Sequence, residues 1–181
     1  LSVITKIVRY NFPMVYIFFM EKMQIDLKEL AVSVIDQEAK AVEKLKPFID
    51  AQLRTMPDRR HTFIAGSSMG GLMALYAAVE YNHVFGRAAA ISPSLWVNPE
   101  GICEMIRHSA MKMDTVLYMD YGENEMKRRK GMHKSYTQVM TQLQKKRILL
   151  SSRMIPKGEH SEASWEKQIP FFMETLLYDL R

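Results

Sequence analysis

Ser68 stands at the centre of a short glycine-rich segment whose spacing could support nucleophilic chemistry. Gly66, Ser68 and Gly70 form the pattern G-x-S-x-G, which follows an apolar run and precedes an alanine-rich helical pattern. In this pattern the serine occupies a sharp turn between a strand and a helix, so that its Oγ projects from the end of the sheet. The backbone N–H of Met69 is then positioned as one oxyanion donor. The alternative interpretation is a tight structural turn.

His160 is the candidate general base, because a serine nucleophile needs a base and the base needs a group that orients it. It follows a late apolar segment, residues 147–155. Two carboxylates flank the end of an earlier apolar segment, residues 115–122: Asp120 lies just before its end, and Glu125 follows it. Serine, acid and histidine in this order match the chain order known for the G-x-S-x-G pattern. The other four histidines do not follow a late strand.

Alternating strand and helix patterns must position these residues. The expected strands are residues 2–10, 12–19, 61–66, 86–92, 115–122 and 147–155, and the expected helices are 26–54, 69–81, 102–111, 132–145 and 165–180. This alternation predicts an α/β fold with a mostly parallel sheet flanked by helices. Pro47 is expected to kink or restart the first helix, and residues 31–35 could instead form a short strand. Ligands bind at the carboxyl ends of strands in such sheets, where the candidate residues lie.

Composition and charge favour one globular domain, residues 1–181, and argue against several classes of function. The hydrophobic fraction of 48% is enough for a real core. The net charge of +5 comes from dispersed basic residues, so nucleic acid is not an expected partner. Cys103 is the single cysteine, which excludes an internal disulfide framework, and the five histidines have no metal-ligand spacing. We therefore expect no metal site.

The apolar stretch at residues 12–20 is too short to span a bilayer, and no small-residue cleavage site of a signal peptide follows it. A buried strand is the favoured interpretation, and no membrane span is expected. The lack of a clear signal peptide slightly favours a cytoplasmic location. The chain begins with Leu1 rather than Met, which leaves its true N-terminus open.

Four segments carry a resemblance to a known family. They are LKPFIDAQLRTMPDRRHTFIAGSSMGGLMALYAA, VFGRAAAISPSLW, LYMDYGENE and GEHSEASWEKQIPFF, which together span roughly residues 45–172. Through them the chain resembles the putative esterase family of α/β-hydrolases, which contains feruloyl and acetyl-xylan esterases, enterochelin-type esterases and S-formylglutathione hydrolase. The resemblance implies an α/β-hydrolase fold with Ser68 as nucleophile and His160 as general base. The family pattern G-x-x-[DE] falls on residues 122–125, so the implied acid is Glu125, with Asp120 as the alternate.

Two tryptophans lie close to these residues in the sequence. By the same resemblance, Trp96 overhangs the site and contacts substrate, and the alternative is that its ring packs the loop against the core. Trp165 follows His160 by five residues and is expected to pack and to fix the histidine loop.

The resemblance also implies a second oxyanion donor in the loop after an early strand, often with His-Gly or Asp-Gly. If residues 12–19 form that strand, the loop is residues 20–23, which contain no glycine. The chain is also shorter than the family between this strand and the helix that precedes Pro57. We therefore expect an α/β-hydrolase fold whose N-terminal strands are partly missing.

These features predict a serine hydrolase that cleaves a carboxylic ester through an acyl-enzyme intermediate, with no metal or organic cofactor. The expected substrate is a small-molecule or carbohydrate-linked ester. Two alternatives stay open. One is a catalytically impaired α/β-hydrolase-like binding domain or a truncated fragment. The other is an acyltransferase, which passes the acyl group to an acceptor other than water.

Overall fold

A central sheet organises the fold. The structure is a computed structural model, which describes residues 4–9, 14–19, 41–128 and 131–179. Within these residues the sheet has six strands: β1 (Ile4–Arg9), β2 (Met14–Phe19), β3 (Thr62–Ser67), β4 (Arg87–Ile91), β5 (Val116–Gly122) and β6 (Leu149–Ile155). Their spatial order follows the chain, and every neighbouring pair is parallel except β1 and β2, which are antiparallel. The predicted, mostly parallel sheet is therefore confirmed.

The three central strands, β3, β4 and β5, are buried along their whole length. Continuous apolar runs such as FIAG and AAAI are typical of parallel strands covered on both faces. Because side chains alternate between the two faces of a strand, Leu117 packs into the core on one face and Tyr118 into the core on the other.

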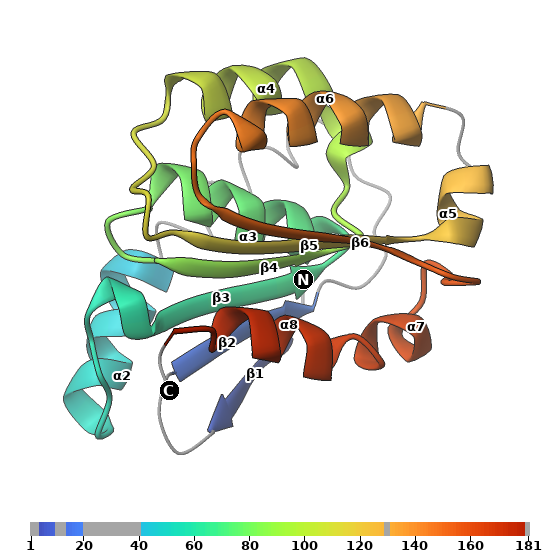
Figure 1. Ribbon diagram of the computed structural model, residues 1–181. Coiled ribbons are helices and arrows are strands. Elements are labelled where there is room, and N and C mark those ends of the chain that lie inside the picture. The colour runs from blue at the N-terminus through green and yellow to red at the C-terminus, as the bar shows by residue number, and fades with distance from the viewer. Residues whose placement is uncertain (1–3, 10–13, 20–40, 129–130, 180–181) are drawn as a thin grey trace.

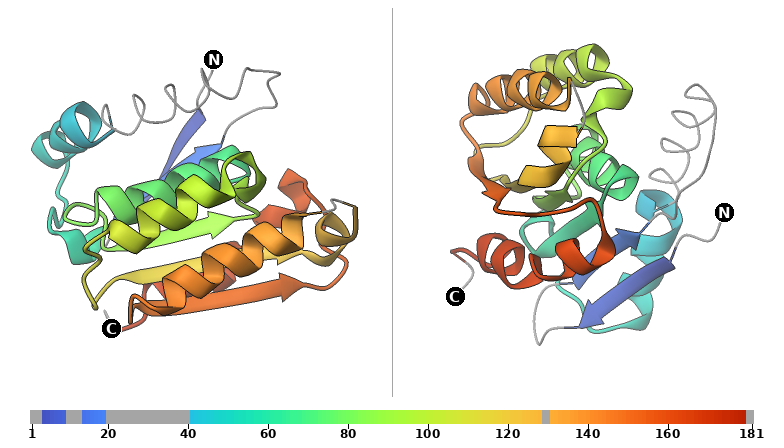
Figure 2. Two further views of the ribbon diagram at one scale, coloured as in Figure 1. Left: turned by 90° about the horizontal axis from the view of Figure 1, so that it is seen from above. Right: turned by 90° about the vertical axis from the view of Figure 1, so that its right-hand side faces the viewer.

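Helices cover both faces of the sheet. Figure 1 shows α3 (Met69–Glu80), α4 (Pro99–His108) and α6 (Met132–Gln144) on one face, and α7 (Glu162–Glu166) and α8 (Ile169–Leu176) on the other. Seen from above, α4 and α6 run side by side (Figure 2). The short helix α5 (Glu123–Arg128) continues directly from β5. The parallel strands β3 to β6 all point their carboxyl ends toward the side of the molecule where α5 and α7 lie (Figure 1).

The first expected helix lies partly outside the described residues. Residues 26–40, which include the alternative strand at 31–35, are not among them. The described part consists of a π-helical turn, η1 (Ala41–Leu45), followed by α2 (Lys46–Gln52). Pro47 lies in the first turn of α2, which follows η1 without a break, so the proline marks the change from the π-helical turn to the α-helix.

The prediction of one final helix over residues 165–180 is wrong. The segment forms two helices, α7 and α8, which are separated by Lys167 and Gln168. Pro170 lies in the first turn of α8, a position that proline favours because it has no N–H to donate within a helix. The apolar periodicity of the segment continues across this break, which is why the pattern alone suggested a single helix.

None of the helices in the described part of the chain has the length and apolar character needed to cross a bilayer.

Candidate active site

Ser68 lies between the end of β3 and the start of α3, with φ 56° and ψ −118°. A positive φ in a residue other than glycine is strained by about 1–3 kcal/mol and persists where neighbouring contacts hold it. Here the N–H of Ser68 donates to the carbonyl of Ile91 at 2.9 Å, and its carbonyl accepts from the N–H of Ser94 at 3.1 Å. The turn is thereby tied to the end of β4.

The glycines around Ser68 are required by close packing of the backbone. A Cβ at Gly66 would lie 2.2 Å from the carbonyl oxygen of Gly70, and one at Gly71 would lie 2.7 Å from that of Ile91. No side chain fits at these distances, so Gly66 lets β3 and α3 approach each other and Gly71 lets α3 approach the end of β4. The glycine pattern thus meets the needs of a tight turn and exposes Ser68 at its apex.

The structure brings together the three residues that the sequence singled out. The Nε2 atom of His160, in the loop after β6, lies 2.8 Å from Ser68 Oγ, and its Nδ1 atom lies 2.6 Å from Glu125 Oε2. An ionised carboxylate only accepts hydrogen bonds, so the proton of the imidazole belongs on Nδ1. Nε2 is then the acceptor for the hydroxyl of Ser68. The side chain of His160 is 18% exposed and that of Glu125 is 1% exposed.

Glu125 has a separate partner set for each carboxylate oxygen. Its Oε1 accepts from the Oγ of Ser92 at 2.6 Å and from the N–H of Gly122 at 2.9 Å, while Oε2 faces His160. A Cβ at Gly122 would lie 2.3 Å from the carbonyl oxygen of Gly158, so glycine lets the end of β5 touch the loop that carries His160. The sequence placed Glu125 in a loop, whereas it lies in the first turn of α5.

Asp120, the alternate acid, lies within β5 and faces a different set of groups. Its Oδ2 accepts from the hydroxyl of Tyr118 at 2.8 Å, and its Oδ1 accepts from the N–H of Ser92 at 3.3 Å. Burial raises the pKa of Asp120 to about 6. The carboxylate that contacts His160 is that of Glu125.

Met69 is the first residue of α3, and the N–H groups in the first turn of a helix have no acceptor within the helix. The N–H of Met69 is therefore suited to donate a hydrogen bond to a negatively charged oxygen next to Ser68. The loop expected to supply a second donor, residues 20–23, lies outside the described residues.

Both tryptophans lie against the histidine ring. The ring of Trp165, in α7, is 4.8 Å from that of His160 and almost perpendicular to it at 88°. The ring of Trp96, in the short helix η3 (Leu95–Val97), lies 6.1 Å from His160 in an edge-to-face arrangement and also packs against the core. Trp96 therefore packs against the core and against His160, and its contact with substrate stays a prediction.

Two serines of the site were missed by sequence reasoning. Ser92 donates to Glu125, and Ser94 Oγ lies 3.5 Å from Ser68 Oγ. Both follow β4, so the rule that sites form beyond the carboxyl ends of parallel strands was the signal that could have found them.

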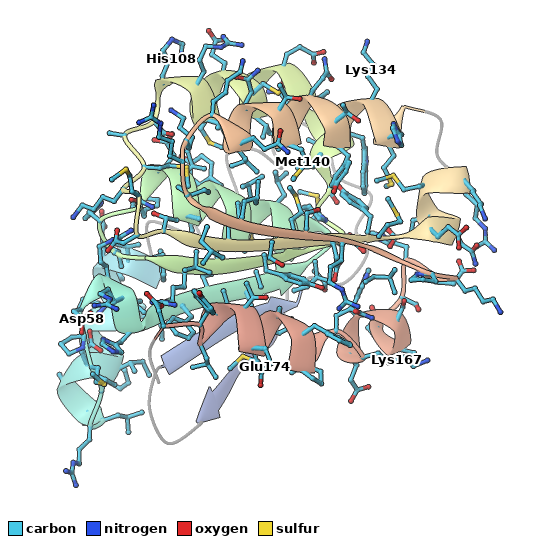
Figure 3. All side chains as sticks on the ribbon, viewed as in Figure 1. Asp58, His108, Lys134, Met140, Lys167 and Glu174 are labelled. Carbon is cyan, nitrogen blue, oxygen red and sulfur yellow. The ribbon has the colours of Figure 1, made fainter. Side chains whose placement is uncertain are left out.

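The other end of the sheet holds a different histidine. His61 Nδ1 lies 2.7 Å from Asp58 Oδ2, before β3 begins. Figure 3 shows Asp58 at the end of the sheet opposite to α5 and α7, and His108 on the outer side of α4. Neither histidine is placed to serve Ser68. In the described ranges, no group of three or more His, Cys, Asp or Glu side chains is arranged to hold a metal ion.

Comparison with known sequences gives one family and one curated relative. The model of the family described as "Putative esterase" matches residues 39–177. The uncharacterized protein YbbA of Bacillus subtilis (strain 168) is 29% identical over 89 residues, which are 49% of this chain and 35% of YbbA. The chain thus matches about a third of the length of that relative.

Comparison with solved structures supports the fold. The enterochelin esterase of Shigella flexneri superposes with a TM-score of 0.72 at 18% identity, covering 93% of this chain and 44% of that protein. The S-formylglutathione hydrolase FrmB of Staphylococcus aureus superposes with a TM-score of 0.58 at 13% identity, covering 84% of this chain and 66% of FrmB. The expected α/β-hydrolase fold is confirmed by this likeness, which at such identities concerns the fold alone.

Proposed function

The chain belongs to the Putative esterase family, and on this premise we propose that it is a serine hydrolase that cleaves carboxylic esters through an acyl-enzyme intermediate. The observation that carries the proposal is the continuous hydrogen-bonded path from Ser68 Oγ through both ring nitrogens of His160 to Glu125, with distances of 2.8 and 2.6 Å. Both distances lie within the range over which a base can take a proton directly.

The reaction begins when Ser68 Oγ attacks the ester carbonyl carbon while its proton moves to Nε2 of His160. The carbonyl oxygen becomes an oxyanion, which the N–H of Met69 stabilises. As the intermediate collapses, the bond to the alcohol breaks and His160 returns its proton to the leaving oxygen. The acyl group remains on Ser68.

Water then releases the acyl group from Ser68 by the same two steps of attack and collapse. His160 takes a proton from the water as it attacks the acyl carbon, and the proton passes to Ser68 Oγ when the acid leaves. Throughout, Glu125 accepts the hydrogen bond from Nδ1–H of His160 and stabilises the imidazolium that forms in both halves of the reaction. No step requires a metal or an organic cofactor.

We propose that Trp96 forms a wall of the substrate site, because its ring lies beside His160 and next to the loop that carries Ser94. The substrate class is a small-molecule or carbohydrate-linked ester.

A fluorescent fluorophosphonate probe tests the proposal, because it reacts with an activated serine hydroxyl. We expect the wild-type protein to be labelled, Ser68→Ala to be unlabelled, and Glu125→Gln to react on the order of 1,000-fold more slowly, since the imidazole loses its orienting carboxylate. Asp120→Asn should react within about threefold of wild type. Ser135→Ala is the matched control, because Ser135 is a buried serine of α6 whose Oγ donates to the backbone carbonyl of Gly131 and not to a residue of the site.

The same series has an outcome that would contradict the proposal. A wild-type protein that is folded by circular dichroism yet stays unlabelled would favour a binding domain without hydrolase activity. Hydrolysis of p-nitrophenyl acetate in the presence of an added alcohol separates the two reactive alternatives, because an acyltransferase would form the new ester in preference to free acetate.

A further inference from the structure

Ser92 links the indole of Trp165 to the carboxylate of Glu125, and the chemistry proposed above makes no use of it. Its Oγ lies 3.0 Å from Nε1 of Trp165 and 2.6 Å from Oε1 of Glu125. Ser92 is 1% exposed, so water does not compete for these contacts. The three groups form what we call the Trp165–Ser92–Glu125 chain.

The direction of the hydrogen bonds in this chain follows from its chemistry. The indole N–H can only donate, so it must point at a lone pair of the Ser92 oxygen. The ionised carboxylate can only accept, so the hydroxyl proton must point at Glu125. A serine hydroxyl ordinarily rotates among several acceptors, but here one orientation satisfies both neighbours.

The backbone of Ser92 is held as firmly as its side chain. Its φ is 43°, a left-handed conformation that is uncommon for serine. Its N–H donates to the carbonyl of Asp120 at 3.0 Å, and the carbonyl of the next residue, Pro93, accepts from the hydroxyl of Tyr121. These contacts tie the end of β4 to β5 and fix the point from which the hydroxyl reaches Glu125.

Trp165 therefore acts on two members of the catalytic path. Its ring packs edge-to-face on His160 with the centroids 4.8 Å apart, and its N–H acts on Glu125 through Ser92. With Oε1 occupied by Ser92 and Gly122, only Oε2 is directed at Nδ1 of His160.

We propose that Ser92 is a positioning residue, oriented by Trp165, that holds the Glu125 carboxylate with Oε2 toward His160. This role rests on the proposed serine-hydrolase function and deepens it. Ser92 is buried and its hydroxyl is engaged by Trp165 and Glu125, so its loss should act on the rate of acylation and not on substrate affinity.

The test measures acylation by a fluorophosphonate at increasing probe concentration, which separates the maximal rate from the half-saturating concentration. We expect Ser92→Ala to lower the maximal rate about tenfold, the scale of one hydrogen bond to a charged group, with the half-saturating concentration unchanged. Trp165→Phe keeps an aromatic ring and removes the N–H, and should lower the rate about threefold. Ser135→Ala is again the matched control.

The double variant provides the decisive comparison. If Trp165 acts on Glu125 through Ser92, then Ser92→Ala with Trp165→Phe should react at the rate of Ser92→Ala alone. Multiplied effects in the double variant, or a wild-type rate for Ser92→Ala, would overturn the proposal. Ser92→Gly also lacks the hydroxyl and suits the positive φ, so it replaces the alanine variant if that one does not fold.

A second readout follows the Nδ1 proton of His160 directly. Its downfield proton resonance should shift in Ser92→Ala and stay in place in Ser135→Ala. A resonance that is the same in wild type and Ser92→Ala would count against the proposal. Absence of labelling in the wild type would instead reject the hydrolase function itself, so the two failures are distinguishable.

Discussion

Two carboxylates near the end of β5 lie in surroundings that give them different chemistry. Glu125 accepts from a hydroxyl, a backbone N–H and the imidazole. Asp120 accepts from Tyr118 and from the backbone of Ser92, but burial dominates and raises its pKa to about 6. Different environments for two neighbouring acids commonly accompany a division of roles.

The raised pKa of Asp120 predicts a dependence of stability on pH. Between about pH 4 and pH 6 the folded protein retains a proton on Asp120 that the unfolded chain has released, since the ordinary value is 3.8. The free energy of unfolding should therefore fall by about 3 kcal/mol from this group as pH rises through that window. Asp120→Asn should lack this fall, so its stability relative to wild type should increase between pH 4 and pH 7.

Urea denaturation of both proteins at several pH values measures this difference. A constant difference in unfolding free energy between pH 4 and pH 7 would mean that Asp120 titrates at its ordinary pKa.

At the scale of elements, the site depends on how closely a strand and a helix can meet. The turn at Ser68 requires β3 and α3 to pack backbone against backbone, and the end of β5 meets the histidine loop in the same manner. Small residues therefore set the position of a nucleophile and of an acid that are far apart in the sequence.

Gly66→Ala tests this dependence. The added Cβ would meet the carbonyl oxygen of Gly70 at 2.2 Å, so β3 and α3 must move apart and displace Ser68. We expect a loss of about 1–3 kcal/mol in unfolding free energy and a loss of fluorophosphonate labelling of about tenfold or more.

Gly131→Ala is the control for Gly66→Ala. Gly131 has φ 94°, and a Cβ added there would meet nothing within 4 Å, so alanine adds backbone strain of about 1 kcal/mol without a collision. Its labelling rate should equal that of wild type. Equal labelling by both variants would show that close packing at Gly66 does not set the position of Ser68.

At the scale of the whole molecule, a buried arginine joins the sheet to the last helix. Arg87 begins β4 and is 1% exposed. Its guanidinium donates to the carbonyls of Arg60, Leu176 and Tyr178 and to the carboxylate of Asp179, at 2.8–2.9 Å. These bonds secure the C-terminal end of α8 against the sheet, and Trp165 of α7 packs in the same buried cluster as Phe172 and Leu176 of α8.

Arg87→Met should therefore destabilise the fold by about 3 kcal/mol, because three carbonyls lose their donor. Asp179→Asn should cost less than about 1 kcal/mol, since its side chain is 54% exposed and its ion pair is screened by water. Thermal unfolding of the two variants beside wild type measures both effects. Similar losses in the two would place the stabilisation in the ion pair and not in the carbonyl contacts.

Much of the fold and part of the site could be predicted because they depend on local patterns. Apolar runs and helical periodicity located the described strands and most helices, and the carboxyl-end rule placed Ser68 and His160 at one edge of the sheet. The final helix was predicted wrongly because apolar periodicity continues through the break before Pro170.

By itself the sequence determined a mostly parallel α/β sheet and a serine on a glycine-lined turn, since both follow from residues close together in the chain. Only the tertiary structure decided that Glu125 and not Asp120 contacts His160. It also decided that Ser92 donates to Glu125 and accepts from Trp165. Those contacts join segments 33 to 73 residues apart, so they depend on strand register and on the angles at which loops leave the sheet. Hydrogen-bond partners at such separations leave no periodic trace in the sequence.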